Sequence, residues 1–286
     1  MSNVPMKKEH PKWARFCKHK LAMAGMIVML LLVLTIVFLP MLLHMDPNAM
    51  DYEYLGKPPN EQYLLGTDTM GRDVFARTLY GGRISILVGL CAVCVSALIG
   101  VPLGLLSGYY ESTVGRVVMR LADVFMSFPN MVLMLVVVAM FNPSIPILIL
   151  VIGVIGWPKY TRLMYSNTLS IRQKDYVEAA RTSGCSTFTV LTKYILPNAV
   201  SPIWVTMTFG VGSAILTEST LSFLGVGIQP PDASWGNLIR EALSYSILST
   251  KPWIWIPAGV AIIIVTVCVN FIGDGVRDAL DPQTKL

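Results

Sequence analysis

Long stretches that lack charged residues are the feature that most restricts how this chain folds. The segment from Leu21 to Leu43 contains no charged side chain. About 20 apolar residues in a helix cross a hydrocarbon core of about 30 Å. The first such segment and the five apolar stretches after it therefore predict an all-α membrane protein with six transmembrane helices. The later stretches are residues 84–107, 121–141, 145–157, 199–224 and 253–272.

Composition supports a membrane protein and excludes several other classes. Of the 286 residues, 54% are hydrophobic and 14% are charged, whereas a soluble domain carries about 25% charged residues. The net charge of +5 is spread between the apolar stretches, so it does not indicate a nucleic-acid surface. The five cysteines form no disulfide pattern. Cys91 and Cys94 lie inside an apolar stretch, which favours packing over redox or metal chemistry.

The charge of the polar segments predicts their side of the membrane. Residues 1–20 are basic, with six lysine or arginine residues against Glu9, and form a predicted cytoplasmic tail. The first apolar segment, 21–43, is longer than the 7–15 residues of a signal peptide and lacks its cleavage site, so we expect a retained helix. Residues 44–82 are rich in acids and form a predicted extracellular or periplasmic loop, in which Asp68 or Thr69 caps a helix through Arg77.

Residues 83–274 are predicted to hold the other five helices, and 275–286 to form a cytoplasmic tail. Gly100, Gly104 and Gly108 recur four apart, a spacing that lets two helices approach closely in lipid. Asp123 lies one turn from Arg120 and is expected to form a local ion pair with it. The pair Trp157–Pro158 marks either a kink or the inner end of the fourth span. In the external segment 225–252, Ser234 is expected to cap a helix that ends near residue 246.

The segment 168–198 is a polar and basic interruption between two apolar stretches, and we expect it in the cytosol. Asp175 is the predicted N-cap of a short helix, with Glu178 reaching back to it as in a capping box. Gly184 is predicted to end this helix in the left-handed backbone conformation, and Ser186 to start a second short helix. Pro197 sets the entry to the next span.

Glu218 is the one charged residue of the fifth span. A carboxylate inside a membrane is a functional candidate by default. Together with Ser219 and Ser222 it either forms hydrogen bonds between helices or lines the translocation path. Both roles are favoured over a proton relay.

The pattern Glu178-Ala179-Ala180, Gly184 and Leu196-Pro197 resembles the EAA loop of ABC-importer permeases, although Tyr194 replaces the usual isoleucine. Three further motifs follow the order found in the dipeptide, oligopeptide and nickel branch, and they resemble its C-type permeases. They are the string 65–85, the pair of strings 221–225 and 235–236, and the tail 273–282.

The resemblance implies a type I ABC importer permease fold and a subunit that forms half of the translocation path for di- or oligopeptides. The implied partners are a second homologous permease subunit, two ABC ATPase subunits, an extracellular or periplasmic solute-binding protein and membrane lipid, with no nucleic acid. The subunit is expected in the cell (inner or plasma) membrane, with both termini cytoplasmic. The chain lacks a Gly-x-x-x-x-Gly-Lys-Ser/Thr loop. We therefore expect no catalysis, cofactor or metal in it, and ATP and Mg²⁺ on the partner ATPases.

The resemblance also assigns the residues that couple the permease to an ATPase. They are Asp175, Glu178, Ala179, Ala180, Arg181, Gly184, Leu196 and Pro197. Two alternatives remain at this stage. One is a stand-alone ion-coupled secondary transporter that uses Glu218 and Asp123, although such carriers usually need several polar groups near the midplane. The other is a nickel or metal chelate as substrate. An intramembrane protease lacks a credible catalytic pair, with only Asp274 beside Gly273.

Overall fold

The computed structural model describes residues 12–110 and 113–280. The predictions for the basic residues before Lys12 and for the end of the tail after Leu280 lie outside these ranges. The described chain consists of helices and loops, with one isolated bridge between Thr67 and Asp73.

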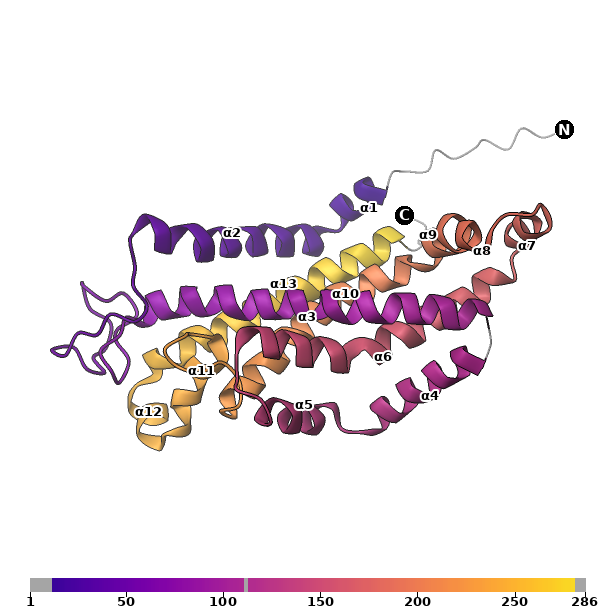
Figure 1. Cartoon of the computed structure of the whole chain (residues 1–286). Coiled ribbons are helices and arrows are strands. Elements are labelled where there is room, and N and C mark those ends of the chain that lie inside the picture. Colours follow the sequence, from indigo (N-terminus) through magenta and orange to yellow (C-terminus); the bar gives the residue numbers. More distant parts are fainter. Residues whose placement is uncertain (1–11, 111–112, 281–286) are drawn as a thin grey trace.

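Five long helices run alongside one another and form the body of the molecule (Figure 1). They are α2 (Lys20–Leu42), α3 (Val74–Tyr110), α6 (Ile145–Arg172), α10 (Ser201–Phe223) and α13 (Ile256–Leu280). The shorter elements are α1 (Lys12–Lys18), α4 (Thr113–Ser127), α5 (Asn130–Ala139), α7 (Asp175–Thr182), α8 (Thr187–Thr189), a π-helix (Val190–Ile195), α9 (Leu196–Ala199), α11 (Trp235–Arg240) and α12 (Tyr245–Thr250), with 3₁₀ turns at Glu241–Leu243 and Pro252–Ile254.

Several of the short elements lie at the two opposite ends of the long helices, whereas α4 and α5 run along their side (Figure 1). Helices α7, α8 and α9 lie at the end that we call the α7 end, on the right of Figure 1. The loop of residues 44–73 lies with α11 and α12 at the other end, which we call the loop end. The two ends therefore face opposite sides of any membrane that the long helices cross.

Helix length and composition agree with the prediction of six spans. The helices α2, α3, α6 and α13 are each long and apolar enough to cross a membrane. Two bent pairs bring the number to six if each counts as one span. They are α4 with α5, bent by 88°, and the helical segment Thr187–Ala199 with α10, bent by 55°.

The third predicted span, 121–141, is not one continuous helix. Helix α4 begins at Thr113, inside the predicted loop, and ends at Ser127. Pro129 then occupies the N-cap position of α5. A proline lacks the backbone N–H and disfavours a helical conformation in the residue before it, here Phe128, so the helix breaks at this point.

One other predicted boundary was wrong. Helix α3 begins at Val74, ahead of the predicted start at Ile84, and neither Asp68 nor Thr69 caps it. Helix α6 continues through Pro158 to Arg172. Of the two alternatives for Trp157–Pro158, the inner end of the span is therefore wrong, and the kink stays a prediction.

Close contact between α3 and α6 explains the predicted glycine stripe. A Cβ atom on Gly100 would lie 2.7 Å from the carbonyl oxygen of Trp157, and one on Gly108 would lie 2.8 Å from the Cβ of Thr168. The hydroxyl of Thr161 donates to the carbonyl of Gly100 (3.1 Å), and Ser96 donates to Gly153 (2.7 Å). The stripe is a packing surface between two helices, as expected.

Helix α2 is fastened to α3 by one arginine. Pro40 in α2 has no N–H, so the carbonyl of Ile36 loses its usual donor four residues later. Arg83 of α3 supplies the replacement and donates to the carbonyls of Ile36 (2.9 Å) and Val37 (2.6 Å).

Candidate functional site

Helix α7 begins differently from the prediction. Lys174 occupies the N-cap position without a side-chain hydrogen bond. Its carbonyl accepts from the N–H groups of Val177 (2.9 Å) and Glu178 (3.2 Å). Asp175 therefore already lies inside the first turn, and the predicted capping box of Asp175 and Glu178 is wrong. Both carboxylates still lie in the first turn, where the helix dipole favours negative charge.

The two faces of α7 have opposite characters. Val177 (0% exposed) and Ala180 (7%) belong to the main hydrophobic core. The opposite face is open to solvent and carries Asp175, Glu178, Ala179 and Arg181. Of the two predicted coupling alanines, only Ala179 is thus available to a partner, because Ala180 packs inward.

Gly184 ends α7 in the left-handed conformation that was predicted, with φ of +81°. The N–H of Cys185 donates to the carbonyl of Ala180 (3.1 Å), and that of Gly184 donates to Arg181 (3.1 Å). This pair of bonds is the Schellman motif, which favours glycine at this position. No atom lies within 4 Å of where a Cβ on Gly184 would stand. The requirement for glycine is therefore conformational rather than steric.

A second helical segment connects α7 to α10. Ser186 caps it as predicted, accepting from the N–H of Thr189 (3.3 Å). The π-helix from Val190 to Ile195 follows and packs its apolar side chains into the main core. Leu196 is half-buried and Pro197 is exposed at the start of α9, just before the chain bends into α10.

Helix α7 also lies close to the end of α3. The guanidinium of Arg172 donates to the carbonyl of Tyr109 (2.7 Å), and that of Arg181 lies 5.9 Å from the centre of the Tyr109 ring. A polar pocket of about 640 Å³ opens at this point. Its lining combines the ends of α3 and α6 with α7: Tyr109, Tyr110, Arg172, Gln173, Glu178, Arg181 and Thr187.

Glu218 is fully buried within the chain, with 0% of its surface exposed. Ser85 of α3 and Ser222 of α10 each donate to its carboxylate at 2.7 Å, and Ser219 lies at 3.4 Å. Ser85 also accepts from the N–H of Trp235, at the start of α11 (3.3 Å). This arrangement favours the hydrogen-bonding role between helices. Lining of the path by Glu218, Ser219 and Ser222 stays a prediction.

Asp123 does not pair with Arg120. It forms an ion pair with Arg162 of α6, and both side chains are half-exposed. The partner lies 39 residues away, so spacing along one helix does not reveal it. The pair joins α4 to α6.

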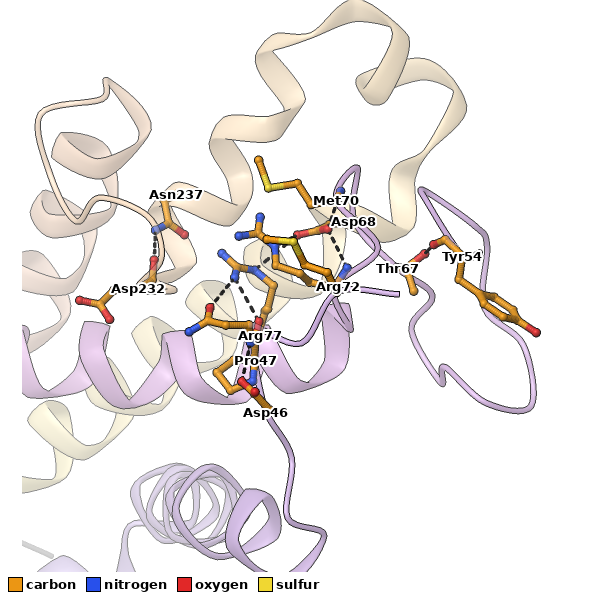
Figure 2. Close-up of polar contacts among 12 residues, drawn as sticks. Asp46, Pro47, Tyr54, Thr67, Asp68, Met70, Arg72, Arg77, Asp232 and Asn237 are labelled. Atoms are coloured by element: carbon orange, nitrogen blue, oxygen red, sulfur yellow. Dashed lines mark hydrogen bonds and ion pairs between the residues drawn. The ribbon is translucent and has the colours of Figure 1, made fainter. Parts of the chain in front are cut away.

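The loop end contains an ion cluster that sequence reasoning missed. Asp68 (1% exposed), Arg72 (5%) and Arg77 (3%) lie together in Figure 2. Asp68 accepts from the side chain of Arg72 at 2.7 Å and lies 3.6 Å from the Nε of Arg77. Arg77 donates to the carbonyl of Pro47 (3.2 Å). The signal in the sequence was two arginines four and nine positions after Asp68, but only the fold reveals that all three residues are buried.

Two acids beside this cluster have raised pKa values. Burial raises the pKa of Asp73, although the N–H groups of Phe75 and Ala76 oppose this change. Burial and, to a smaller degree, the charge of Asp68 raise the pKa of Glu241, while Arg72 and other nearby arginines oppose it.

The remaining predictions about binding groups concern metals and the external helix. No group of three or more metal-ligating side chains lies together among residues 12–110 and 113–280. Ser234 caps α11 in a capping box with Asn237, as expected in part. The helix, however, ends at Arg240 rather than near residue 246, because a 3₁₀ turn follows.

Comparison with known protein families identifies this arrangement. Residues 100–286 match the family described as binding-protein-dependent transport system inner membrane component. The chain belongs to this permease family. Residues 12–59 of the permease match the N-terminal TM domain of oligopeptide transport permease C. The predicted family is therefore confirmed by two matches that together cover most of the chain.

Similar proteins match the permease over nearly its full length. The glutathione transport system permease protein GsiD of Pectobacterium atrosepticum is 38% identical over 274 residues, which is 96% of this chain and 90% of that protein. The di/tripeptide transport system permease protein DppC of Pseudomonas aeruginosa is 35% identical over 279 residues, covering 96% and 91%.

Solved structures confirm the fold. A chain of the inward-facing MetNI methionine ABC transporter aligns with a TM-score of 0.57 at 18% identity, covering 70% of the permease and 94% of that chain. A chain of an amino acid ABC transporter, solved with histidines, aligns with a TM-score of 0.53 at 14% identity, covering 70% and 92%. The permease thus has the type I ABC importer fold that was predicted.

Proposed function

We propose that this permease forms half of the translocation path for di- or oligopeptides and that α7 couples it to a cytosolic ATPase. The observation that carries the coupling role is the structure of α7. Its inner face is fixed in the core by Val177 and Ala180, while its outer face presents charged side chains to solvent. The packed face couples α7 rigidly to the rest of the permease, and the exposed face is accessible to a partner protein. A movement of that partner would therefore be transmitted to the permease.

The names of the relatives support the class of substrate. Two similar permeases are named for glutathione and for di- and tripeptides, and these substrates share a small peptide backbone. A nickel or metal chelate is the alternative substrate from the same branch. Uptake of a labelled tripeptide and of a nickel chelate by the same reconstituted importer separates the two.

The proposed assembly contains one further homologous permease subunit, two ABC ATPase subunits and a solute-binding protein. ATP and Mg²⁺ bind to the ATPases, so the permease itself carries no catalytic residue and no cofactor. The residues 83–274 form the core of this subunit, and 168–198 form its coupling loop.

Charge supports an orientation with the α7 end in the cytosol and the loop end outside. Arg172, Lys174 and Arg181 lie at the α7 end, and positive residues favour the cytoplasmic side. Both termini then lie in the cytoplasm. The subunit accordingly spans the inner or plasma membrane several times.

The mechanism has three steps. The outer face of α7 sits on one ATPase, where Glu178 pairs with a basic residue of that subunit. Closure of the ATPase dimer on ATP moves α7. The second helical segment, with Leu196 and Pro197, passes that movement to α10, and the two permease halves rock between inward- and outward-open states.

A charge reversal on the outer face of α7 tests the coupling role. We expect Glu178→Lys to lower ATPase binding and ATP-driven uptake at least tenfold, because it opposes the expected basic partner. Glu53→Lys, an equally exposed acid at the loop end, is the matched control and should retain both. Normal binding and uptake by the Glu178 variant would contradict the proposed coupling role.

A stand-alone carrier would instead transport without an ATPase. The burial of Glu218 among serines of its own chain does not support that alternative. Uptake into vesicles by the isolated permease, driven by an ion gradient alone, would overturn the proposed function.

A further inference from the structure

The coupling helix α7 has an attachment besides its two covalent connections. It is joined directly to α6 through Gln173 and Lys174, and to α10 through the segment 185–200. In addition to the packing of Val177 and Ala180 in the core, a polar attachment leads to the end of α3. It consists of Tyr109, Arg172 and Arg181, which we call the Tyr109 junction.

The first contact of the junction is a hydrogen bond at the C-terminus of α3. The last four carbonyls of a helix have no intrahelical donor, and Tyr109 is the residue before the last in α3. The guanidinium of Arg172 donates to this carbonyl at 2.7 Å. Its positive charge also lies at the negative end of the α3 dipole, where cations are favoured. The end of α6 is therefore tied to the end of α3.

The second contact uses the side chain of the same tyrosine. Arg181 of α7 lies 5.9 Å from the centre of the Tyr109 ring, within the range of a cation–π interaction. The adjacent pocket of about 640 Å³ leaves space between α7 and α3. Because the two helices are not packed tightly there, individual side chains carry the contact between them.

Helix α3 extends from this junction to the other end of the molecule. Its 37 residues span about 55 Å at 1.5 Å per residue. It packs closely on α6 through its glycines, and at the loop end it carries Arg77 of the buried ion cluster. A displacement of the α7 end of α3 would thus reach the loop end through one continuous helix.

We propose that the Tyr109 junction positions α7 against α3 and makes the two move together during transport. The proposal rests on the proposed coupling function and adds a route that bypasses α10. Tyr109 and Arg172 act as positioning residues, since neither lies on the outer face of α7 that receives the ATPase.

The first test measures peptide transported per ATP hydrolysed in the complete reconstituted importer. Tyr109→Leu removes the ring, whereas Tyr109→Phe retains it and is the matched control. Arg172→Gln removes the charge, and Arg172→Lys restores it. We expect Tyr109→Leu and Arg172→Gln to lower the ratio about fivefold, which corresponds to about 1 kcal/mol. ATPase binding should remain normal, and both conservative variants should stay near wild type.

A second test measures a distance and leaves the junction intact. Spin-labelled cysteines replace Tyr110 of α3 and Thr182 of α7, both exposed, in a permease whose five native cysteines are changed to alanine. We expect the same distance between the two labels without nucleotide and with bound ATP, because α7 and the end of α3 move together. A distance that changes between the two states would overturn the proposal, as would equal transport ratios for Tyr109→Leu and Tyr109→Phe. If wild-type transport does not require ATP, the proposed function fails instead, which is a separate result.

Discussion

The two ends of the permease use the same kinds of charged residues in opposite ways. At the loop end, Asp68, Arg72 and Arg77 are buried, and both arginines form ion pairs with Asp68. At the α7 end, Asp175 and Glu178 are exposed without an ion pair to any described residue on a helix whose apolar face is fixed, and Arg181 is exposed beside the Tyr109 ring. Buried charges are costly unless paired, whereas exposed ones cost little and stay available. The comparison indicates that the loop end is fastened internally and that the α7 end is open to a partner.

The largest effect is expected when the acid of the buried cluster is removed, which tests whether the cluster stabilises the loop end. Asp68→Ala leaves Arg72 and Arg77 buried without their carboxylate, and loss of one partner from a buried pair costs about 3–5 kcal/mol. We expect a marked fall in the melting temperature of the purified permease. Glu53→Ala, an exposed acid of the same loop, should leave it unchanged. Equal melting temperatures for both variants would show that the cluster does not fasten the loop end.

Variants of Glu218 test whether buried polar contacts also stabilise the permease within its membrane-spanning helices. Glu218→Ala leaves the hydroxyls of Ser85 and Ser222 without their acceptor, at a cost of about 1–3 kcal/mol. Glu218→Gln keeps an acceptor and should be milder. We expect both variants, once assembled, to transport at the wild-type rate per complex. Full assembly of Glu218→Gln with abolished transport would instead assign the carboxyl to the path or to proton transfer.

A substitution of Gly184 tests whether the α7 end affects partner binding rather than the overall stability of the permease. A non-glycine residue at its φ of +81° costs about 1–2 kcal/mol. Gly184→Ala should therefore loosen the end of α7 and weaken ATPase binding several-fold, while global thermal stability changes little. Gly259→Ala is the control, because its Cβ would also meet nothing within 4 Å but its backbone φ is ordinary. Similar ATPase affinities for the two variants would contradict the conformational requirement.

The smallest expected effect is a pH dependence at the loop end. Burial raises the pKa of Glu241 in the folded state, so its neutral form is favoured there. The resulting stabilisation is complete below the usual pKa of glutamate and is lost as pH rises through the higher folded value. Glu241→Gln should flatten the dependence of melting temperature on pH in that window. An unchanged profile would exclude Glu241 as its source.

Local rules predicted the features that depend only on neighbouring residues. The apolar stretches located the long helices, because burial in lipid needs only length and hydrophobicity. Gly184, Ser186 and Ser234 ended or capped helices as expected, because these interactions close within a few residues. The helices of the coupling segment 168–198 were therefore predictable, although the N-cap of α7 was not.

Features that depend on the whole fold were not predictable in this way. Asp123 pairs with Arg162, 39 residues away, although Arg120 offered a plausible partner one turn away. Asp68 pairs with Arg72 and Arg77, four and nine residues away, instead of capping a helix, and only the fold buries all three. The break at Pro129 is a different case, because the proline itself was a signal in the sequence. The segment 121–141 was nevertheless predicted as one continuous helix, because it is apolar throughout most of its length.

The π-helix between Val190 and Ile195 has a consequence for insertions and deletions. A π turn accommodates one more residue than an α turn, so removing one residue there would leave regular α-helix and intact hydrogen bonds. Each residue of an α-helix accounts for about 100° of rotation. Such a deletion would therefore preserve the connector yet turn the outer face of α7 away from its original direction. In this permease, the length of this single turn therefore sets where the coupling surface points.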